Sequence, residues 1–278
     1  MKAFSLNIRG ELKEFHQPAV MSIVNLTEDS FFAPSRVQAD AVVDRVGKMV
    51  EAGAEIIDLG ACSTRPGSTP PAPQVESERL CAAISAIRSA FGSQLLLSVD
   101  TYRASVARDA VEAGADIIND IGGGTLDGEM FATVAELRVP YILMHLRGTP
   151  ETMQQFTDYD DVVADVIADL SRKLRALSDA GVADVIVDPG FGFAKTVEQN
   201  YRMLEHLEAF EMLGKPILVG VSHKSMLRRV VGEDYQSTLA ATTAVNMAAM
   251  ERGASILRVH DTAAAVAAVK VYNMLSNS

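Results

Sequence analysis

An eightfold alternation of short apolar runs and longer helix-like segments constrains the fold of this chain more than any other feature. Each run is rich in valine, isoleucine and leucine, ends at a polar residue, and precedes a segment with helical periodicity. The runs cover residues 20–24, 56–57, 95–99, 117–118, 141–144, 185–187, 217–221 and 256–259. The polar residues that end them lie on average about 34 positions apart, which is the size of a βαβ unit.

This alternation predicts an α/β fold of the (β/α)₈ TIM barrel type. Strands that are apolar almost throughout are buried on both faces, and eight strand–helix units in roughly 250 residues are what a closed barrel requires. The competing topology is an open doubly wound sheet. Against it, no G-x-G-x-x-G follows the first run, and we interpret Gly122, Gly123 and Gly124 as a flexible loop. No linker or charge run divides the chain, so we expect one domain over residues 1–278.

Composition restricts the partners and the compartment. The chain carries 25 basic and 36 acidic residues, a net charge of −11, which argues against a nucleic-acid surface. No apolar run approaches the roughly 18 residues of a membrane helix, and charged residues interrupt the first fifteen positions before a targeting segment can form. Two cysteines are too few for a disulfide framework. We therefore expect no membrane partner and a reducing, cytoplasmic location.

In a barrel of this kind the carboxyl ends of the strands converge on one mouth. The residues that end the eight runs are Asn25, Asp58, Asp100, Asn119, His145, Asp188, Ser222 and His260, with Arg65, Lys224 and Arg258 nearby. The carboxylates and amides among them can pair with the edge of a flat heterocycle, whereas the basic residues suit an anion or a metal-bound polyphosphate. We expect the acidic residues on one rim to hold the ring and the basic residues opposite to hold a phosphorylated tail.

Several of these residues also have a purely structural interpretation. An Asp or Asn that ends a strand often caps the next helix. We interpret Asp58 as structural, because the loop continues past it, and His145 as a satisfied, half-buried histidine. His16 and His206 lie among polar neighbours and should be at the surface. Arg258 lies within an apolar run, so its charge must meet a partner or a ligand.

Taken together, the run ends carry a resemblance to the dihydropteroate synthase family over almost the whole chain. The matching segments are residues 23–31, 57–67, 98–102, 115–120, 143–150, 188–193, 219–225 and 258–261. The resemblance implies a homodimeric TIM barrel with Mg²⁺ as cofactor. It also implies condensation of 6-hydroxymethyl-7,8-dihydropterin diphosphate with 4-aminobenzoate, giving 7,8-dihydropteroate and pyrophosphate in folate biosynthesis, and sensitivity to sulfonamides.

The resemblance also implies roles for individual residues. Those expected to be catalytic are Asp100, Asp188 and Lys224, and the residue expected to bind the metal is Asn25. The remaining substrate-binding residues are Asp29, Thr64, Arg65, Pro66, Asn119, Met144, Phe193, Gly220, Ser222, Arg258 and His260. Two long loops, residues 27–36 and 62–73, would close over the site.

The chemistry expected from this set is an SN1-like substitution. Departure of diphosphate leaves positive charge that delocalises into the pterin ring, so Asp100 would stabilise the cation while Mg²⁺, Arg258 and His260 stabilise the leaving group. The aromatic amine then attacks an electrophile already formed, which makes a general base dispensable. Lys224 would act by positioning.

Several positions depart from the pattern of the family: Glu28, Ala61 with Cys62, His223, and the middle of the first loop at residues 32–36. His223 stands where arginine usually precedes the lysine, which makes the charge of that corner pH-dependent. Two alternatives remain beside the synthase. One is a corrinoid-dependent methyltransferase with the same pterin pocket, which would not need the 63–67 loop or Arg258 and His260. The other is a catalytically silent pterin-binding paralogue.

Overall fold

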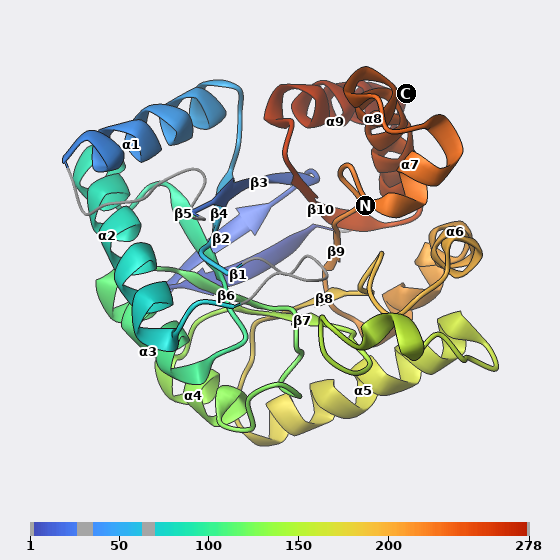
Figure 1. Ribbon diagram of the computed structural model, residues 1–278, viewed down its shortest axis with the longest axis horizontal. Helices are drawn as coiled ribbons and strands as arrows, with labels where there is room; N and C mark the ends of the chain where they lie inside the picture. The colour runs from blue at the N-terminus through green and yellow to red at the C-terminus, as the bar shows by residue number, and fades with distance from the viewer. Residues whose placement is uncertain (1–2, 27–35, 63–69, 277–278) are drawn as a thin grey trace.

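The computed structural model describes residues 3–26, 36–62 and 70–276, and it contains a closed barrel of parallel strands surrounded by helices (Figure 1). The strands are β3 (Ala19–Asn25), β4 (Ile56–Gly60), β5 (Leu96–Asp100), β6 (Ile117–Asp120), β7 (Tyr141–Met144), β8 (Val185–Asp188), β9 (Ile217–Val219) and β10 (Ala254–Val259). They follow one another in chain order, and β10 pairs with β3 to close the ring. The predicted TIM barrel is confirmed, and the open sheet is wrong.

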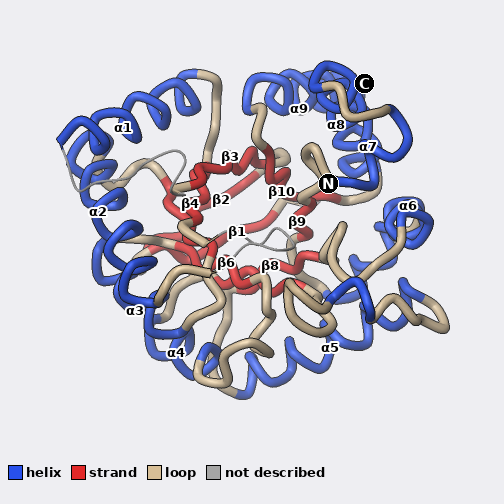
Figure 2. Tube along the Cα trace, viewed as in Figure 1, coloured by secondary structure: helices blue, strands red, loops and turns tan. Residues whose placement is uncertain are grey.

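Helices follow the strands and form the outer layer (Figure 2). They are α1 (Arg36–Glu51), α2 (Pro73–Phe91), α3 (Ala104–Ala113), α4 (Met130–Leu137), α5 (Val162–Asp179), α6 (Val197–Glu205), α7 (Ser225–Val231), α8 (Tyr235–Glu251) and α9 (Thr262–Ser276). Side chains define several of their starts: the Asp161 carboxylate accepts from the first turn of α5, and Thr196 forms a capping box with Gln199 in α6. None of the described helices is long and apolar enough to cross a membrane.

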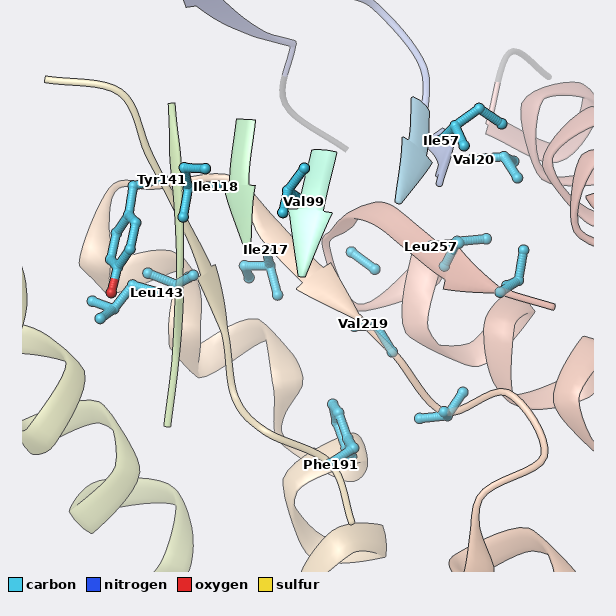
Figure 3. Packing of buried hydrophobic residues seen from close by; sticks show 14 of the residues in the cluster. Val20, Ile57, Val99, Ile118, Tyr141, Leu143, Phe191, Ile217, Val219 and Leu257 are labelled. Carbon is cyan, nitrogen blue, oxygen red and sulfur yellow. The ribbon is translucent and has the colours of Figure 1, made fainter. Parts of the chain in front are cut away.

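Alternate residues along each strand fill two separate apolar layers. Val20 and Ile57 point outward and pack under the helices, as Figure 3 shows for part of this layer. Met21 and Ile56, their direct neighbours, point inward and fill the barrel axis together with one residue from each of the strands β5 to β10. Burial of each such side chain contributes about 1.5–3 kcal/mol. The barrel is therefore a packed core and not a pore, and only its ends can hold a ligand.

An antiparallel hairpin, β1 (Phe4–Ile8) and β2 (Glu11–Phe15), precedes the barrel and was not anticipated from the sequence. Its buried side chains, Leu6 and Phe15, join the cluster along the barrel axis. The turn between the strands is Arg9-Gly10, both with positive φ, which is the backbone that a tight hairpin requires. Because the hairpin plugs the amino-terminal end of the barrel, the carboxyl-terminal end is the one left for chemistry.

The three glycines at 122–124 do not form the flexible loop that we expected. The backbone N–H groups of Gly122 and Gly124 donate to the Asp120 carboxylate at 2.7 and 2.8 Å. Gly123 has φ +53°, and a Cβ there would lie 2.2 Å from the Met144 carbonyl oxygen. The segment is a tight turn that only glycine fits, because the backbone of β7 passes against it.

A candidate active site at the carboxyl ends of the strands

Arg258 on β10 lies at the centre of the barrel mouth, between two carboxylates. Its Nε donates to Asp58 Oδ2 and its Nη2 donates to Asp100 Oδ2, both at 2.6 Å. Burial alone lowers the pKa of Arg258, but the charges of Asp58 and Asp100 more than reverse this effect. The guanidinium is therefore charged, and its charge is shared by two acids before any ligand arrives.

This arrangement corrects the expectation that acidic and basic residues face each other across the mouth. Arg258 is in direct contact with Asp100, so the two halves of the site meet at one ion pair. Asp58, interpreted as structural, is fully buried within β4, two residues before the end of the strand, and also accepts from Asn119 Nδ2 at 3.1 Å. The Asp58 carboxylate therefore fixes the positions of Arg258 and Asn119 by hydrogen bonds.

Asn25 and Asp100 lie side by side across Gly60. A Cβ built on Gly60 would be 3.9 Å from Asn25 Oδ1 and 3.8 Å from Asp100 Oδ2, so the glycine leaves space between the two side chains. Burial raises the pKa of Asp100 to about 7, against the opposing charge of Arg258 and with support from Asp58 and Glu76. Asp100 is thus an acid that changes its charge close to neutral pH.

Asp188 and Lys224 form the next part of the mouth. The Asp188 carboxylate accepts from the Gly190 backbone N–H at 2.7 Å, and burial raises its pKa while Lys224 opposes the shift. Lys224 Nζ donates to the Phe191 carbonyl oxygen at 2.6 Å and lies 4.7 Å from the centroid of the Phe193 ring. Burial lowers the pKa of Lys224 to about 8, against the attraction of Asp188.

Gly220 lies next to both Lys224 and Arg258. A Cβ on Gly220 would lie 3.9 Å from Lys224 Nζ and 3.7 Å from Arg258 Cβ. Because Gly220 has no side chain, both Lys224 and Arg258 can lie against its backbone at the mouth.

Ser222 and His260 hold each other at the ends of β9 and β10. The Ser222 hydroxyl accepts from the His260 backbone N–H at 3.2 Å and shares a second hydrogen bond of 3.0 Å with Nδ1 of the same residue. His260 is exposed, but desolvation of its ring by the neighbouring residues, followed by the charge of Arg258, lowers the pKa of His260 to about 4. The lowered pKa favours the neutral imidazole, which can offer hydrogen bonds to a phosphate.

His223, the residue that departs from the family pattern, faces a different set of partners. Its Nε2 lies 2.5 Å from Asp261 Oδ2, its Nδ1 lies 2.8 Å from the Thr238 hydroxyl, and its ring stacks on Tyr235. The ring meets His260 edge-on, at 5.9 Å between centroids. The corner therefore ties the end of β9 to α8 and to the residue after His260.

Met144 contributes the apolar wall of the mouth. It ends β7, is buried, and packs in a small cluster with Ile121, Leu146, Met153 and Ala194, against which the Phe193 ring also lies. The structure thus places Asn25, Asp100, Asn119, Met144, Asp188, Phe193, Gly220, Ser222, Lys224, Arg258 and His260 at one end of the barrel. The predicted residues Asp29, Thr64, Arg65 and Pro66 lie outside the described residues, as does Glu28.

Two residues behind the mouth complete the picture. His145, which follows β7, receives a hydrogen bond from Lys195, which agrees with its interpretation as a satisfied histidine. It is almost fully buried and not half-buried as expected. Lys195 itself was missed. The only sequence indication was a lysine directly after the segment Asp188-Pro189-Gly190-Phe191-Gly192-Phe193-Ala194, in a loop with few other charges.

Cys62 is one of the positions that depart from the family pattern. Burial raises the pKa of its thiol to about 11, so it is not a reactive thiolate.

Comparisons with known proteins identify the family and agree with the fold. The family described as pterin binding enzyme matches residues 21–260. The dihydropteroate synthase of Synechocystis sp. is 40% identical over 260 residues, which is 92% of this chain and 89% of that protein. The structure is similar to Xanthomonas albilineans dihydropteroate synthase with 4-aminobenzoic acid, with 36% identity and a TM-score of 0.89 over 99% of this chain and 98% of that one. A Yersinia pestis dihydropteroate synthase in a sulfonamide drug complex gives 34% identity and 0.90 over 99% of both chains.

Proposed function

The chain belongs to the dihydropteroate synthases of the pterin binding enzyme family, and we propose that its barrel mouth joins a dihydropterin diphosphate to 4-aminobenzoate in folate biosynthesis. The observation that carries the proposal is the arginine held between two carboxylates, with a third acid, Asp188, and a lysine beside it. One flat, electron-poor ring with a charged tail can contact all of these groups at once.

The ring is held by the acids and by Lys224. Asp188 and Asn119 offer hydrogen bonds to the edge of the pterin, Lys224 faces its polar substituent, and Met144 covers its face. Asp100 stands where the side chain of the ring begins, with a carboxylate whose charge is available near neutral pH. Each of these groups is fixed by its strand end, so the enzyme does not have to reorganise when charge develops.

The diphosphate replaces Asp100 as the partner of Arg258. A phosphate oxygen pair can accept from the guanidinium fork, as the two carboxylates do in the absence of substrate. His260 and Ser222 add neutral hydrogen bonds on the same side. Once Arg258 turns to the diphosphate, the Asp100 carboxylate is released to face the ring.

Bond breaking then precedes bond making. The bond between the methylene carbon and the diphosphate oxygen breaks with its electron pair going to the diphosphate, and the resulting positive charge spreads into the ring beside Asp100. The amine nitrogen of 4-aminobenzoate uses its lone pair to bond to that carbon and afterwards loses a proton to water or to the released pyrophosphate. No side chain has to remove the proton beforehand, because the cation attracts the neutral amine.

Magnesium fits this site as a companion of the substrate. Among the side chains that the structure describes, no three of His, Cys, Asp or Glu are grouped as a metal site. Mg²⁺ does not need such a cage, since it keeps several waters and is commonly held by one or two protein oxygens and substrate phosphates. Asn25 Oδ1, beside Asp100, would be such an oxygen. When bound, the ion offsets the charge of the leaving diphosphate.

A homodimer would cover an apolar side of the barrel. Large apolar side chains are exposed on two helices at the carboxyl-terminal end of the chain: Val230 on α7, and Val271 and Met274 on α9. These helices lie next to α8, at the orange and red end of Figure 1. A second copy of the chain, related by a twofold axis, would remove this surface from water.

The low cysteine count supports a cytoplasmic location.

The test is a product assay with purified protein. Incubation with the pterin diphosphate, 4-aminobenzoate and Mg²⁺ should release pyrophosphate and dihydropteroate in equal amounts, and a sulfonamide should compete with 4-aminobenzoate. Methyl transfer from methyl-tetrahydrofolate to a corrinoid protein would instead indicate the methyltransferase. Pterin binding without either product would indicate a silent paralogue and contradict the proposal.

A further inference from the structure

Lys195 is a buried cation behind the mouth, and none of the steps proposed above uses it. Only 4% of the residue is exposed. Its Nζ is 3.0 Å from each of three partners, which are His145 Nδ1, the Gly190 carbonyl oxygen and the Phe193 carbonyl oxygen. An ammonium group has three N–H bonds, so each of them has a partner here.

These partners tie the end of β7 to the loop that follows β8. Gly190 in that loop has φ +74°, and a Cβ there would lie 2.2 Å from the carbonyl oxygen of His145. Ala194 has φ +51°, a left-handed conformation that is unfavourable for a residue with a Cβ. The Tyr159 hydroxyl donates to the Ala194 carbonyl oxygen at 2.9 Å from the other side. The backbone of this loop therefore has an unfavourable conformation at Ala194 and packs closely against β7, and hydrogen bonds from Lys195 and Tyr159 stabilise it.

The opposite side of the same loop holds Lys224. The Phe191 carbonyl oxygen accepts from Lys224 Nζ, and the Phe193 ring lies beneath that ammonium. A Cβ on Gly192 would come within 3.1 Å of Lys224 Cδ, so backbone and lysine stem are in contact. Residues 190–193 are therefore clamped between two lysines, one buried and one at the mouth.

The groups around Lys195 determine the protonation states of Lys195 and His145, and so the direction of the hydrogen bond between them. Burial lowers the pKa of Lys195 to about 7, and Asp188 opposes that shift. Burial, reinforced by Lys195, also lowers the pKa of His145 to about 2, so the imidazole is neutral and accepts through Nδ1. The other charged groups that face Lys195 are Arg147, Asp169 and Lys224.

We propose that Lys195 is a positioning residue for the condensation, one that holds residues 190–193 so that their backbone and aromatic ring keep Lys224 aimed into the mouth. It acts through Lys224 and touches no substrate. The inference rests on the proposed function, because it assigns Lys195 a part in that same reaction.

The first test compares Lys195→Met with Lys173→Met. Lys173 is a matched control, since it is also largely buried and lies near the same strand ends, but it pairs with Asp169 on its own helix. We expect Lys195→Met to lower kcat/KM for the pterin diphosphate by about tenfold or more, and Lys173→Met to stay within about twofold of wild type. Equal activity of the two variants would overturn the inference. An inactive wild type would contradict the proposed function instead.

The pH profile separates positioning from mere destabilisation. The charged and titratable groups that act on Lys224 are Asp188, Arg258, Asp100, Lys195 and His260. Burial lowers the pKa of Lys224 to about 8, so kcat/KM should fall above about pH 8 as Lys224 loses its proton. In Lys195→Met the released Lys224 is better hydrated, its pKa rises, and this fall moves to higher pH. A variant that merely has less folded protein would show a lower profile of unchanged shape, and that result would overturn the proposal.

A second pair of variants tests the same contact from its other end. His145→Asn keeps an acceptor close to the position of Nδ1, whereas His145→Leu removes it. We expect His145→Asn to retain most of the wild-type kcat/KM and the wild-type pH limit, and His145→Leu to behave like Lys195→Met. This pair decides the question if Lys195→Met does not fold. Two variants with the same kinetics and the wild-type pH limit would overturn the inference.

Discussion

Arg258 and Asp100 form an ion pair of 2.6 Å that joins β10 to β5 across the barrel mouth. The pair links residues 158 positions apart in the chain and is completed by Asp58 on the other edge of the guanidinium. Both groups of the pair are needed for catalysis in our account, one for the ring and one for the diphosphate. In the proposed mechanism the pair is a resting contact, which the substrate would open when its phosphates bind the arginine.

Replacement of Asp100 by asparagine should abolish most of the turnover. The amide has the same shape but no charge with which to stabilise the developing cation, so we expect kcat to fall by about a hundredfold to a thousandfold. Circular dichroism should show that the barrel remains folded. A folded Asp100→Asn variant with near-normal kcat would contradict the cation role.

Replacement of Arg258 by alanine should act mainly on binding of the diphosphate substrate. We expect KM for the pterin diphosphate to rise by about a hundredfold, while KM for 4-aminobenzoate changes much less. The same change leaves Asp58 and Asp100 without their partner, so the free energy of unfolding should drop by about 3–5 kcal/mol. Unchanged affinity for the diphosphate would remove Arg258 from the phosphate site.

The free energy of unfolding should record the titration of Asp100. Burial raises its pKa from 3.8 to about 7, so between these values the folded protein binds a proton that the unfolded chain has released. Wild type should therefore lose stability relative to Asp100→Asn as the pH rises from about 4 to 7, with a constant difference above that range. Thermal unfolding of both proteins at several pH values measures it. A difference in Tm that does not vary with pH would show that Asp100 titrates normally.

Replacement of His223 by arginine should flatten the pH dependence of the mouth. Arginine carries a permanent charge and an imidazole does not, and Asp261 and His260 both lie against this side chain. We expect KM for the diphosphate substrate to vary less with pH in the variant than in wild type. Superimposable profiles of the two proteins would end this hypothesis.

The amino-terminal hairpin should affect stability without affecting the site. Phe15 is buried against the barrel axis, so Phe15→Ala should lower the free energy of unfolding by about 3–5 kcal/mol. Leu12, on the same strand, is 71% exposed and serves as the control, with no change expected for Leu12→Ala. Denaturant unfolding measures both. A comparable loss in the two variants, or an altered KM in Phe15→Ala, would show that the hairpin has another role.

The barrel could be predicted from sequence because its strands are buried on both faces and therefore leave short apolar runs at regular spacing. The hairpin could not, because β2 is largely exposed and carries Glu11, Lys13 and Glu14, so its alternation is weak. The polar ends of the runs indicated most of the mouth. The actual contacts of Arg258 were not predictable, because Asp58 lies 200 residues away and meets it only when the ring closes. Lys195 escaped notice for the same reason, since His145 is fifty residues from it in the chain.

A crystal structure of the protein with the pterin diphosphate and Mg²⁺ tests the central claim most directly. Our account predicts one molecule across the mouth, with its ring against Asp100, Asp188 and Lys224 and its diphosphate on Arg258, which has left Asp100. A ring and diphosphate bound elsewhere, or an Arg258–Asp100 pair that stays closed beneath a bound substrate, would contradict it.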